Sequence, residues 1–364
     1  MTEEATVPCS CTFVPPHVMR ELETSGDKDV AQLAKRTAQE SDEIRHRRAG
    51  HIVGDTPKKG SRTRRARAQA LSDLAPTTAG FVAAGAAGRE VYDSGNQWAQ
   101  RVSLARGEGD PATSDADVGF AHDFAGHVRE YYANALGRRS IDNKGLNLVL
   151  NVHFGTSFMN AFWDGDEMTF GDGDGQVFSS FAASLDVVAH ELTHGVVQHT
   201  AGLVYQDQPG ALNEHFADVF GIAVSHAVNG STDWLIGNEI MGPRLYGEAL
   251  RSMKAPGTAY DNPLMGKDPQ PAHMNNLYTG PLDYGGVHIN SGIPNRAFYL
   301  VASELGVDSA TRIWYRSLQL LGPTAQFADA ASMLAESARV LTKAGNLPQG
   351  ATQCVRSAFR EVGL

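Results

Sequence analysis

The chain has 364 residues, which is enough for two domains, or for one domain with an attached segment, and for a large buried core. Its formal net charge is −10 and charges of both signs are spread along it, so a general nucleic-acid surface is disfavoured. The three cysteines lack zinc-finger spacing and imply no disulfide framework. No segment is long and apolar enough to span a bilayer, which gives no membrane partner.

The N-terminus lacks the basic start and the apolar run of a secretory signal. We therefore expect a soluble protein that is either cytoplasmic or secreted by a route without a classical signal peptide.

Residues 1–48 form the first unit, in which Pro15 and Pro16 precede charged sequence with apolar residues at helical spacing. This pattern predicts an amphipathic helical pair. Residues 49–80 are rich in Gly, Lys and Arg, include GSRTRRARAQA and lose the periodicity. They read either as a nucleic-acid or partner patch or as a protease-sensitive connector, and we favour a connector with a processing site.

A folded domain begins near residue 89. We expect a strand at residues 90–93, a helix within residues 115–136, a strand in LNLVLNVHF and a hairpin in NAFWDGDEMTFGDGDG. The GDGDG sequence lacks the later ligands of an EF-hand and is predicted to be a plain turn.

The stretch from residue 184 to residue 202, SLDVVAHELTHGVVQHTAG, predicts a buried helix. Ser184 suits its N-cap, Gly202 suits its C-terminal stop, and apolar residues recur at spacings of three and four. His190 and His194 lie four residues apart, so one helical face offers two imidazoles to one metal ion. The H-E-x-x-H pattern is short, and a metal site needs a third ligand.

Glu214, in GALNEHFADVFG, supplies that third ligand near the start of the next helix. Two His and one Glu leave an open position on zinc, which is typical of a catalytic site. Asp218 and Asn213 are expected to hold the second nitrogen of each ligating imidazole. Further helices are predicted at residues 210–228, 295–305, 309–321, 325–344 and 350–362, so that strands precede helices and the fold class is α+β with two lobes.

The motifs NAFW, GDGDGQ, DVVAHELTH, TAGLVYQ, GALNE, LRSM and GGVHINSGI occur in this order. Together they resemble the thermolysin-type (M4, gluzincin) zinc metallopeptidases from about residue 91 to residue 364. CTFVPPHVMREL resembles the short propeptide of the protealysin branch. The resemblance implies a propeptide at 1–48, a β-rich lobe at 81–202 that ends with the active-site helix, and a helical lobe at 203–364.

The resemblance also implies the roles of the site residues. A neutral zinc endopeptidase would bind one Zn²⁺ through His190, His194 and Glu214, and Glu191 would assist the attack of a zinc-bound water on a peptide bond. Tyr205 and His288 would donate to the oxyanion, and Asp283 would orient His288. The partners would be peptide or protein substrates and the chain's own propeptide, which acts as an intramolecular inhibitor.

Substrate contacts follow from the same resemblance. Asn160 and Ala161 would hold an extended peptide as an added strand, and Trp163 would line the cleft. The pocket for the residue after the scissile bond, where the family prefers bulky apolar side chains, would consist of Phe178, Val187, Leu250 and Arg251.

For calcium, only Asp186 and Asp233 match the carboxylates of thermolysin, and Ser225, Leu235 and Asn238 stand at the other positions. Calcium needs six or more oxygen ligands, so the site is expected to be weakened, single or absent.

Two other functions compete with the peptidase. The chain could be a latent zinc-bound precursor that acts as a binding module, or its zinc could be structural. The complete set of chemical residues argues against both. A separate hypothesis places Cys9 or Cys11 at the open zinc position of the precursor, because thiolate is a strong zinc ligand; the competing interpretation is a flexible terminal thiol.

Overall fold

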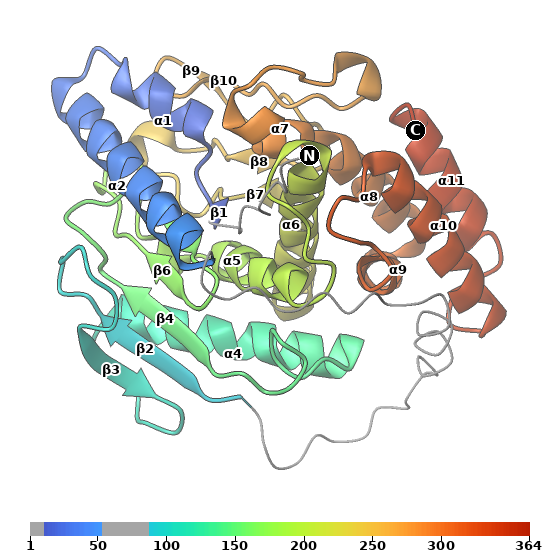
Figure 1. Cartoon of the computed structure of the whole chain (residues 1–364), viewed down its shortest axis with the longest axis horizontal. Helices are drawn as coiled ribbons and strands as arrows, with labels where there is room; N and C mark the ends of the chain where they lie inside the picture. The colour runs from blue at the N-terminus through green and yellow to red at the C-terminus, as the bar shows by residue number, and fades with distance from the viewer. Residues whose placement is uncertain (1–10, 53–86) are drawn as a thin grey trace.

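A computed structural model describes residues 11–52 and 87–364 of the protein. The described part has two lobes, one built around a mixed sheet and one made mainly of helices, with helix α5 (Leu185–Gln198) between them (Figure 1). This is the α+β arrangement predicted from the sequence. Most of the predicted connector and Cys9 lie outside the described residues.

The sheet has six strands in the order β1-β5-β6-β4-β2-β3. β4 pairs in parallel with β2 and β6, and the other pairs are antiparallel. The predicted hairpin is β5–β6. Strand β1 comes from the N-terminal unit and forms one edge of the sheet. The strands are β1 (Cys11–Thr12), β2 (Arg89–Asp93), β3 (Ser103–Gly107), β4 (Leu148–Val152), β5 (Ala161–Trp163) and β6 (Met168–Phe170).

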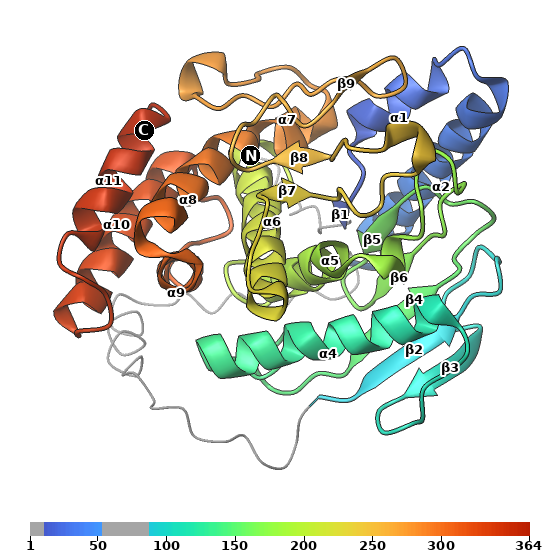
Figure 2. The same ribbon diagram turned by 180° about the vertical axis from the view of Figure 1, so that it is seen from behind.

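Helix α4 (Ala116–Leu136) runs along one face of this sheet and also packs on α5 (Figure 2). It begins where Asp115 accepts hydrogen bonds from the backbone N–H groups of Asp117 and Val118, and it ends at Gly137 in the left-handed conformation. The GDGDG sequence is a turn, as predicted, because Asp174 accepts from three successive backbone N–H groups.

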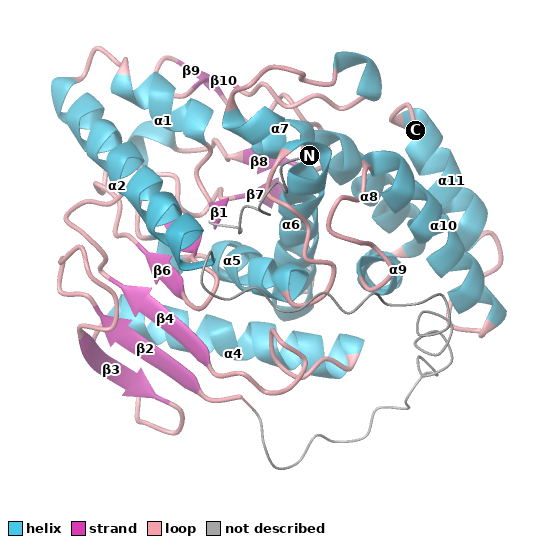
Figure 3. Cartoon of the chain, in the orientation of Figure 1, coloured by secondary structure: helices cyan, strands magenta, loops and turns pink. Residues whose placement is uncertain are grey.

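Helices dominate the second lobe (Figure 3). They start one to three residues from the predicted positions. The predicted segments correspond to α6 (Asp207–Asn229), α8 (Gly292–Leu305), α9 (Val307–Leu318), α10 (Phe327–Lys343) and α11 (Ala351–Glu361). The remaining elements are α7 (Asp283–Asn290), the short helices η1 (Phe181–Ala183), η2 (Pro243–Leu245) and η3 (Met274–Asn276), and the paired strands β7 (Leu235–Ile236) with β8 (Arg251–Ser252) and β9 (Asp261–Asn262) with β10 (Gly266–Lys267).

The N-terminal unit contains the predicted helical pair, α1 (Pro16–Glu23) and α2 (Lys28–Ile52). Val18, Leu22 and Ala34 are fully buried in the main core, whereas Leu33 is only partly buried against it. Helix α2 continues four residues into the range assigned to the connector. Within the described ranges, no helix combines the length and apolar character needed to cross a membrane.

The central helix differs from its prediction at both ends. Ser184 occupies the N-cap position, but its side chain caps no backbone group, because its hydroxyl donates to the carboxylates of Asp186 and Glu239. The helix ends at Gln198, and Gly202 lies in the turn that follows. The predicted apolar stripe is buried, since Val188, Leu192 and the rest of it are at most 5% exposed.

Candidate active site

Helices α5 and α6 bring together the three predicted metal ligands. The Nε2 atoms of His190 and His194 lie 3.0 Å apart, and they lie 3.4 and 3.5 Å from the two carboxylate oxygens of Glu214. All three side chains are fully buried. The helical spacing of four places both imidazoles on one face, and the packing of α5 against α6 sets Glu214 opposite them.

The other nitrogen of each imidazole has a hydrogen-bond partner on α6. His190 Nδ1 lies 2.9 Å from Asp218 Oδ1, and His194 Nδ1 lies 2.9 Å from Asn213 Oδ1. With these acceptors each Nδ1 carries the proton, so both Nε2 lone pairs face the same point. Glu214 Oε2 is buried without a hydrogen-bond partner among the described residues. Such a buried, unpaired carboxylate oxygen beside two imidazole lone pairs fits a divalent cation such as zinc.

Asp218 is the centre of a wider network. Arg251 approaches it with Nε and Nη2 at 2.9 Å, and Asn295 Nδ2 donates to its second oxygen at 2.9 Å. Burial opposes ionisation of Asp218, but Arg251 and His190 outweigh it and lower the pKa of Asp218 to about 2. The carboxylate is therefore charged at neutral pH and can hold His190.

Glu191 lies one residue from the first ligand and is fully buried. Burial raises its pKa to about 8. Neither carboxylate oxygen has a hydrogen-bond partner of ordinary geometry among the described residues, although the Trp163 backbone lies close enough to lower that pKa slightly. A carboxylate with free oxygens and a pKa near neutrality suits proton transfer to and from a water.

His288 enters the site from α7, where the Asp283 carboxylate holds its ring and its backbone. The two Asp283 oxygens accept from His288 Nδ1 at 2.6 Å and from the backbone N–H of His288 at 2.8 Å. The chain just before is left-handed at Tyr284, Gly285 and Gly286. A side chain at Gly285 would collide with Asp207, so glycine is required there.

Tyr205 faces both His288 and the metal ligands. Its hydroxyl lies 3.2 Å from His288 Nε2 and donates a hydrogen bond to Glu214. Burial opposes protonation of His288, but Glu214 and Asp283 outweigh it and raise the pKa of that histidine. His288 and Tyr205 thus place two hydrogen-bond donors beside Glu214.

The predicted substrate strand is already paired with the protein's own N-terminal segment. β1 runs antiparallel to β5, with Cys11 opposite Trp163 and Thr12 opposite Phe162. The pairing continues beyond β1, where Phe13 N–H donates to the Ala161 carbonyl at 3.0 Å. The Asn160 amide then bonds to both backbone groups of Val14, at 2.8 and 3.3 Å.

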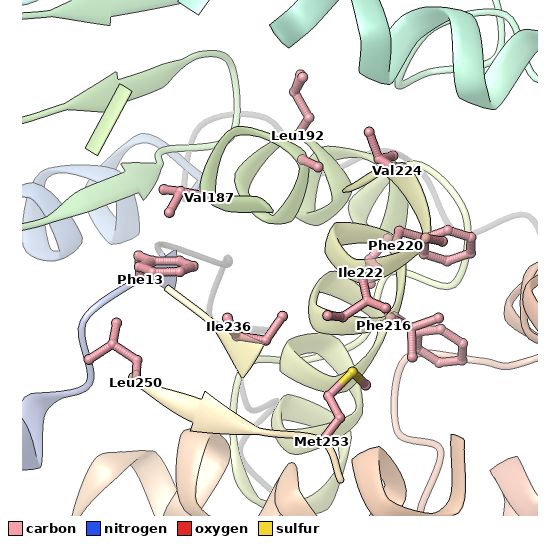
Figure 4. Close-up of a cluster of buried hydrophobic side chains, with 14 of the residues drawn as sticks. Phe13, Val187, Leu192, Phe216, Phe220, Ile222, Val224, Ile236, Leu250 and Met253 are labelled. Carbon is pink, nitrogen blue, oxygen red and sulfur yellow. The ribbon is translucent and has the colours of Figure 1, made fainter. Parts of the chain in front are cut away.

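The predicted pocket holds the Phe13 ring, which is fully buried (Figure 4). The ring meets His190 edge-on at 5.0 Å between centroids and lies near Leu250 and Val187. Arg251 places its guanidinium 5.1 Å from the ring centroid and donates to the Phe13 carbonyl at 3.3 Å. Complete burial of a Phe side chain stabilises docking of this segment by roughly 1.5–3 kcal/mol. Phe178 is also fully buried, next to Phe181, whose ring contacts Phe13.

Trp163 contributes its backbone to the strand pairing, while its side chain is buried against α5. Its Nε1 donates to Gln198 at 3.0 Å, and a side chain on Gly195 would touch its ring. The indole therefore packs beneath the site in the core.

The predicted calcium residues border a cavity of about 220 Å³. Asp186 accepts from the backbone N–H groups of Val187 at 2.8 Å and Gly237 at 2.7 Å. Asp233 accepts from the Leu235 N–H and from the Asn238 amide. Glu239, which the sequence reasoning missed, also borders the cavity. Both predicted carboxylates thus already bind protein donors.

Cys11 lies beside the ligands. Its Sγ and one ligand atom each of His194 and Glu214 are all within 4.8 Å of one another. Cys11 is disulfide-bonded, although the cysteine spacing predicts no disulfide framework. Cys354 is a free, buried thiol. The location agrees with the zinc-ligand hypothesis for Cys11, but a thiolate would require reduction of that disulfide.

Sequence reasoning missed three contributors: Phe13 in the pocket, Thr12 at the site, and Asn295 behind Asp218. A signal for the first existed, because Phe13 is a bulky apolar residue two positions before the Pro15-Pro16 motif. Asn295 lies 77 residues from Asp218, so only the fold reveals their contact.

Two buried imidazoles and a carboxylate that can hold a metal ion lie with a buried Glu side chain, a His and a Tyr beside a strand edge, and this arrangement suits a metal-dependent peptidase. Residues 55–198 match the thermolysin metallopeptidase catalytic domain, and residues 201–364 match the thermolysin metallopeptidase alpha-helical domain. The chain belongs to the thermolysin family of metallopeptidases.

Individual relatives agree with this assignment. The chain is 40% identical to an extracellular metalloprotease of Pectobacterium carotovorum over 85% of its length and 84% of that protein. It is 41% identical to thermolysin of Alicyclobacillus acidocaldarius over 70% of its length and 46% of that protein. Its structure resembles the precursor of protealysin, a metalloproteinase from Serratia proteamaculans, with a TM-score of 0.80, 36% identity and coverage of 97% and 99% of the two chains.

Proposed function

We propose that this metalloendopeptidase uses zinc, cleaves on the amino side of bulky apolar residues and is made as a precursor that its own N-terminal unit holds inactive. The observation that carries the proposal is the position of Phe13. Its side chain fills an apolar pocket beside His190, and it directly follows a strand that pairs with the edge of β5. A substrate would bind in the same way, as an added strand with one side chain in the pocket.

His190, His194 and Glu214 would hold the metal, which supplies Lewis-acid polarisation of the peptide carbonyl and a lowered pKa of the attacking water. Glu191 accepts the proton of that water and delivers it to the leaving amine. His288 and Tyr205 donate hydrogen bonds to the developing oxyanion. Asn160 and Ala161 hold the peptide backbone, and the pocket around Leu250 and Val187 selects the residue after the cleaved bond.

The competing function is a latent zinc-bound binding module. The Glu191 carboxylate disfavours it, because no described residue gives its oxygens a hydrogen bond of ordinary geometry, and a buried base left in this state suits proton transfer better than binding. A purely structural zinc is disfavoured by the presence of only three protein ligands from the predicted set.

A peptide library tests the chemistry. The zinc-loaded protein is first treated briefly with trypsin, which cuts at the arginines of RTRRAR, and the products are then identified by mass spectrometry. We expect cuts before Phe and Leu and about one zinc per chain, with no cuts by the Glu191→Gln chain. Equal cutting by that variant, or no preference for apolar residues, contradicts the proposal.

Export from the cell is also proposed, because one relative is named an extracellular metalloprotease. Comparing the amount of protein in the culture medium and in the cells of the source organism tests it, and retention in the cells contradicts it.

A further inference from the structure

The N-terminal segment occupies the cleft in the direction that a substrate would take. Thr12 presents its carbonyl oxygen to His288 Nε2 at 2.9 Å. The next residue, Phe13, fills the specificity pocket and gives its N–H to Ala161. The donor for the oxyanion therefore contacts the carbonyl of one peptide bond, and the pocket contacts the side chain on the other side of that bond.

We infer that Thr12–Phe13 is an intramolecular cleavage site of this enzyme, an inference that rests on the proposed peptidase function. The neighbouring bonds are placed differently. The Phe13 carbonyl is bound by Arg251 at 3.3 Å, and both backbone groups of Val14 are bound by Asn160. Among the described residues of the N-terminal unit, only Thr12 presents its carbonyl to His288, so the Thr12–Phe13 bond is the described one with its carbonyl beside an oxyanion donor.

Contacts from the N-terminal helices hold the bond in place from within the same chain. Arg45 of α2 donates to the Thr12 hydroxyl at 2.7 Å, and its guanidinium lies 5.0 Å from the Tyr284 ring centroid. Thr37 of the same helix accepts from the Met159 N–H at 3.2 Å, next to the strand that pairs with β1. With the reacting bond tethered in this way, cleavage needs no encounter with a second molecule.

The reaction is an ordinary hydrolysis. One water adds its oxygen to the Thr12 carbonyl carbon while Glu191 takes its proton, and the C–N bond to Phe13 breaks. Glu191 passes that proton to the departing nitrogen, and the second proton of the water follows as the new acid ionises, so the products are a Thr12 carboxylate and a Phe13 ammonium group. The cut removes the strand β1, whereas α1 and α2 stay docked through their buried residues. The new N-terminus therefore starts in the pocket.

The test follows the full-length chain by intact mass after zinc is added to metal-free protein. We expect loss of residues 1–12 and a new N-terminus at Phe13, with a first-order rate that is unchanged over about a hundredfold range of protein concentration. Phe13→Leu should be cut at a similar rate, whereas Phe13→Asp should be cut about a hundredfold more slowly, because the apolar pocket rejects a charge.

Mixing provides the matched control. Glu191→Gln chains mixed with an equal amount of wild type should stay intact at position 12 while the wild type is cut, because the reaction is intramolecular. Peptide hydrolysis after brief trypsin treatment is measured on the same samples. A chain that hydrolyses the peptide but keeps residues 1–12, or loses another segment first, overturns the inference and leaves the proposed function standing. A chain without either activity contradicts both.

Discussion

Single residues in this site act through their neighbours. His288 is useful because Asp283 fixes its Nδ1 and a run of left-handed residues turns it toward the cleft. His190 and His194 can offer their Nε2 lone pairs to a metal ion because Asp218 and Asn213 accept hydrogen bonds from their Nδ1 atoms. We make two predictions at this scale, one for His288 and one for Asn213.

His288→Ala removes a hydrogen-bond donor to the oxyanion. We expect kcat to fall about 10²–10³-fold with a much smaller change in KM, because the interaction strengthens in the transition state. Steady-state kinetics of the trypsin-treated enzyme on a peptide with Phe after the cleaved bond measure this. An unchanged kcat would show that the Thr12 contact of His288 serves only to dock the N-terminal segment.

Asn213→Ala removes the acceptor of His194 Nδ1, which lies 2.9 Å away. The imidazole then loses its fixed tautomer and orientation, so zinc affinity should fall roughly 10–100-fold. Competition with a chromogenic chelator measures the affinity, and His194→Ala serves as the reference for complete loss of a ligand. Zinc binding as tight as in the wild type would contradict the assigned role of Asn213.

At the scale of elements, the sequence predicted the helices well and their ends less well. The H-E-x-x-H helix, the hairpin and the helical lobe follow from periodicity and turn residues, which are local signals. The sequence predicts a helix stop at Gly202 because glycine suits that role, but α5 ends at Gln198 and the glycine lies in the following turn. The sequence also predicts Ser184 as the cap, yet the carboxylates of Asp186 and Glu239 bind its hydroxyl instead.

The contacts that complete the site were harder to predict because they are long-range. Residue spacing predicts the metal ligands, and the family resemblance predicts Tyr205 and His288 as hydrogen-bond donors at the site. The place of β1 beside β5 joins residues about 150 apart, so no local pattern could reveal it. The same is true of Asn295, which supports Asp218 from another helix.

His17 makes the docking of α1 sensitive to pH. Its imidazole bonds to the Tyr260 hydroxyl at 3.1 Å, and burial lowers its pKa from 6.5 to about 4, while Asp283 opposes this change and His288, Arg251 and Arg20 add to it. Between pH 6.5 and about pH 4, the His17 imidazole therefore binds a proton more readily in the undocked segment than in the docked one. Docking should therefore weaken as the pH falls through this range, by up to roughly 3 kcal/mol.

Thermal unfolding of the Glu191→Gln chain, which cannot digest itself, measures this between pH 7 and pH 4.5. The same series with His17→Gln added is the control and should lose less stability on acidification. Parallel pH curves for the two chains would contradict the role of His17.

At the scale of the whole molecule, direct packing around α5 holds the two lobes together. At the predicted calcium position, the protein's own N–H groups already bind the carboxylates. Because Asp186 already accepts from Gly237 and Val187, we expect fewer than two tightly bound calcium ions per chain. Removal of calcium with a selective chelator should shift the unfolding temperature by less than about 2 °C. Metal analysis that finds two tightly bound equivalents would contradict this expectation.

The central claim is that a complete peptidase site is closed by the chain's own N-terminal unit. Its most direct test is the rate of hydrolysis of one fluorogenic peptide, measured on the zinc-loaded protein before and after trypsin cuts the connector and the N-terminal fragment is removed. We predict a rise of at least about a hundredfold for the wild type and no measurable activity for Glu191→Gln in either state. An unchanged rate, or an equal rise in the variant, would contradict the claim.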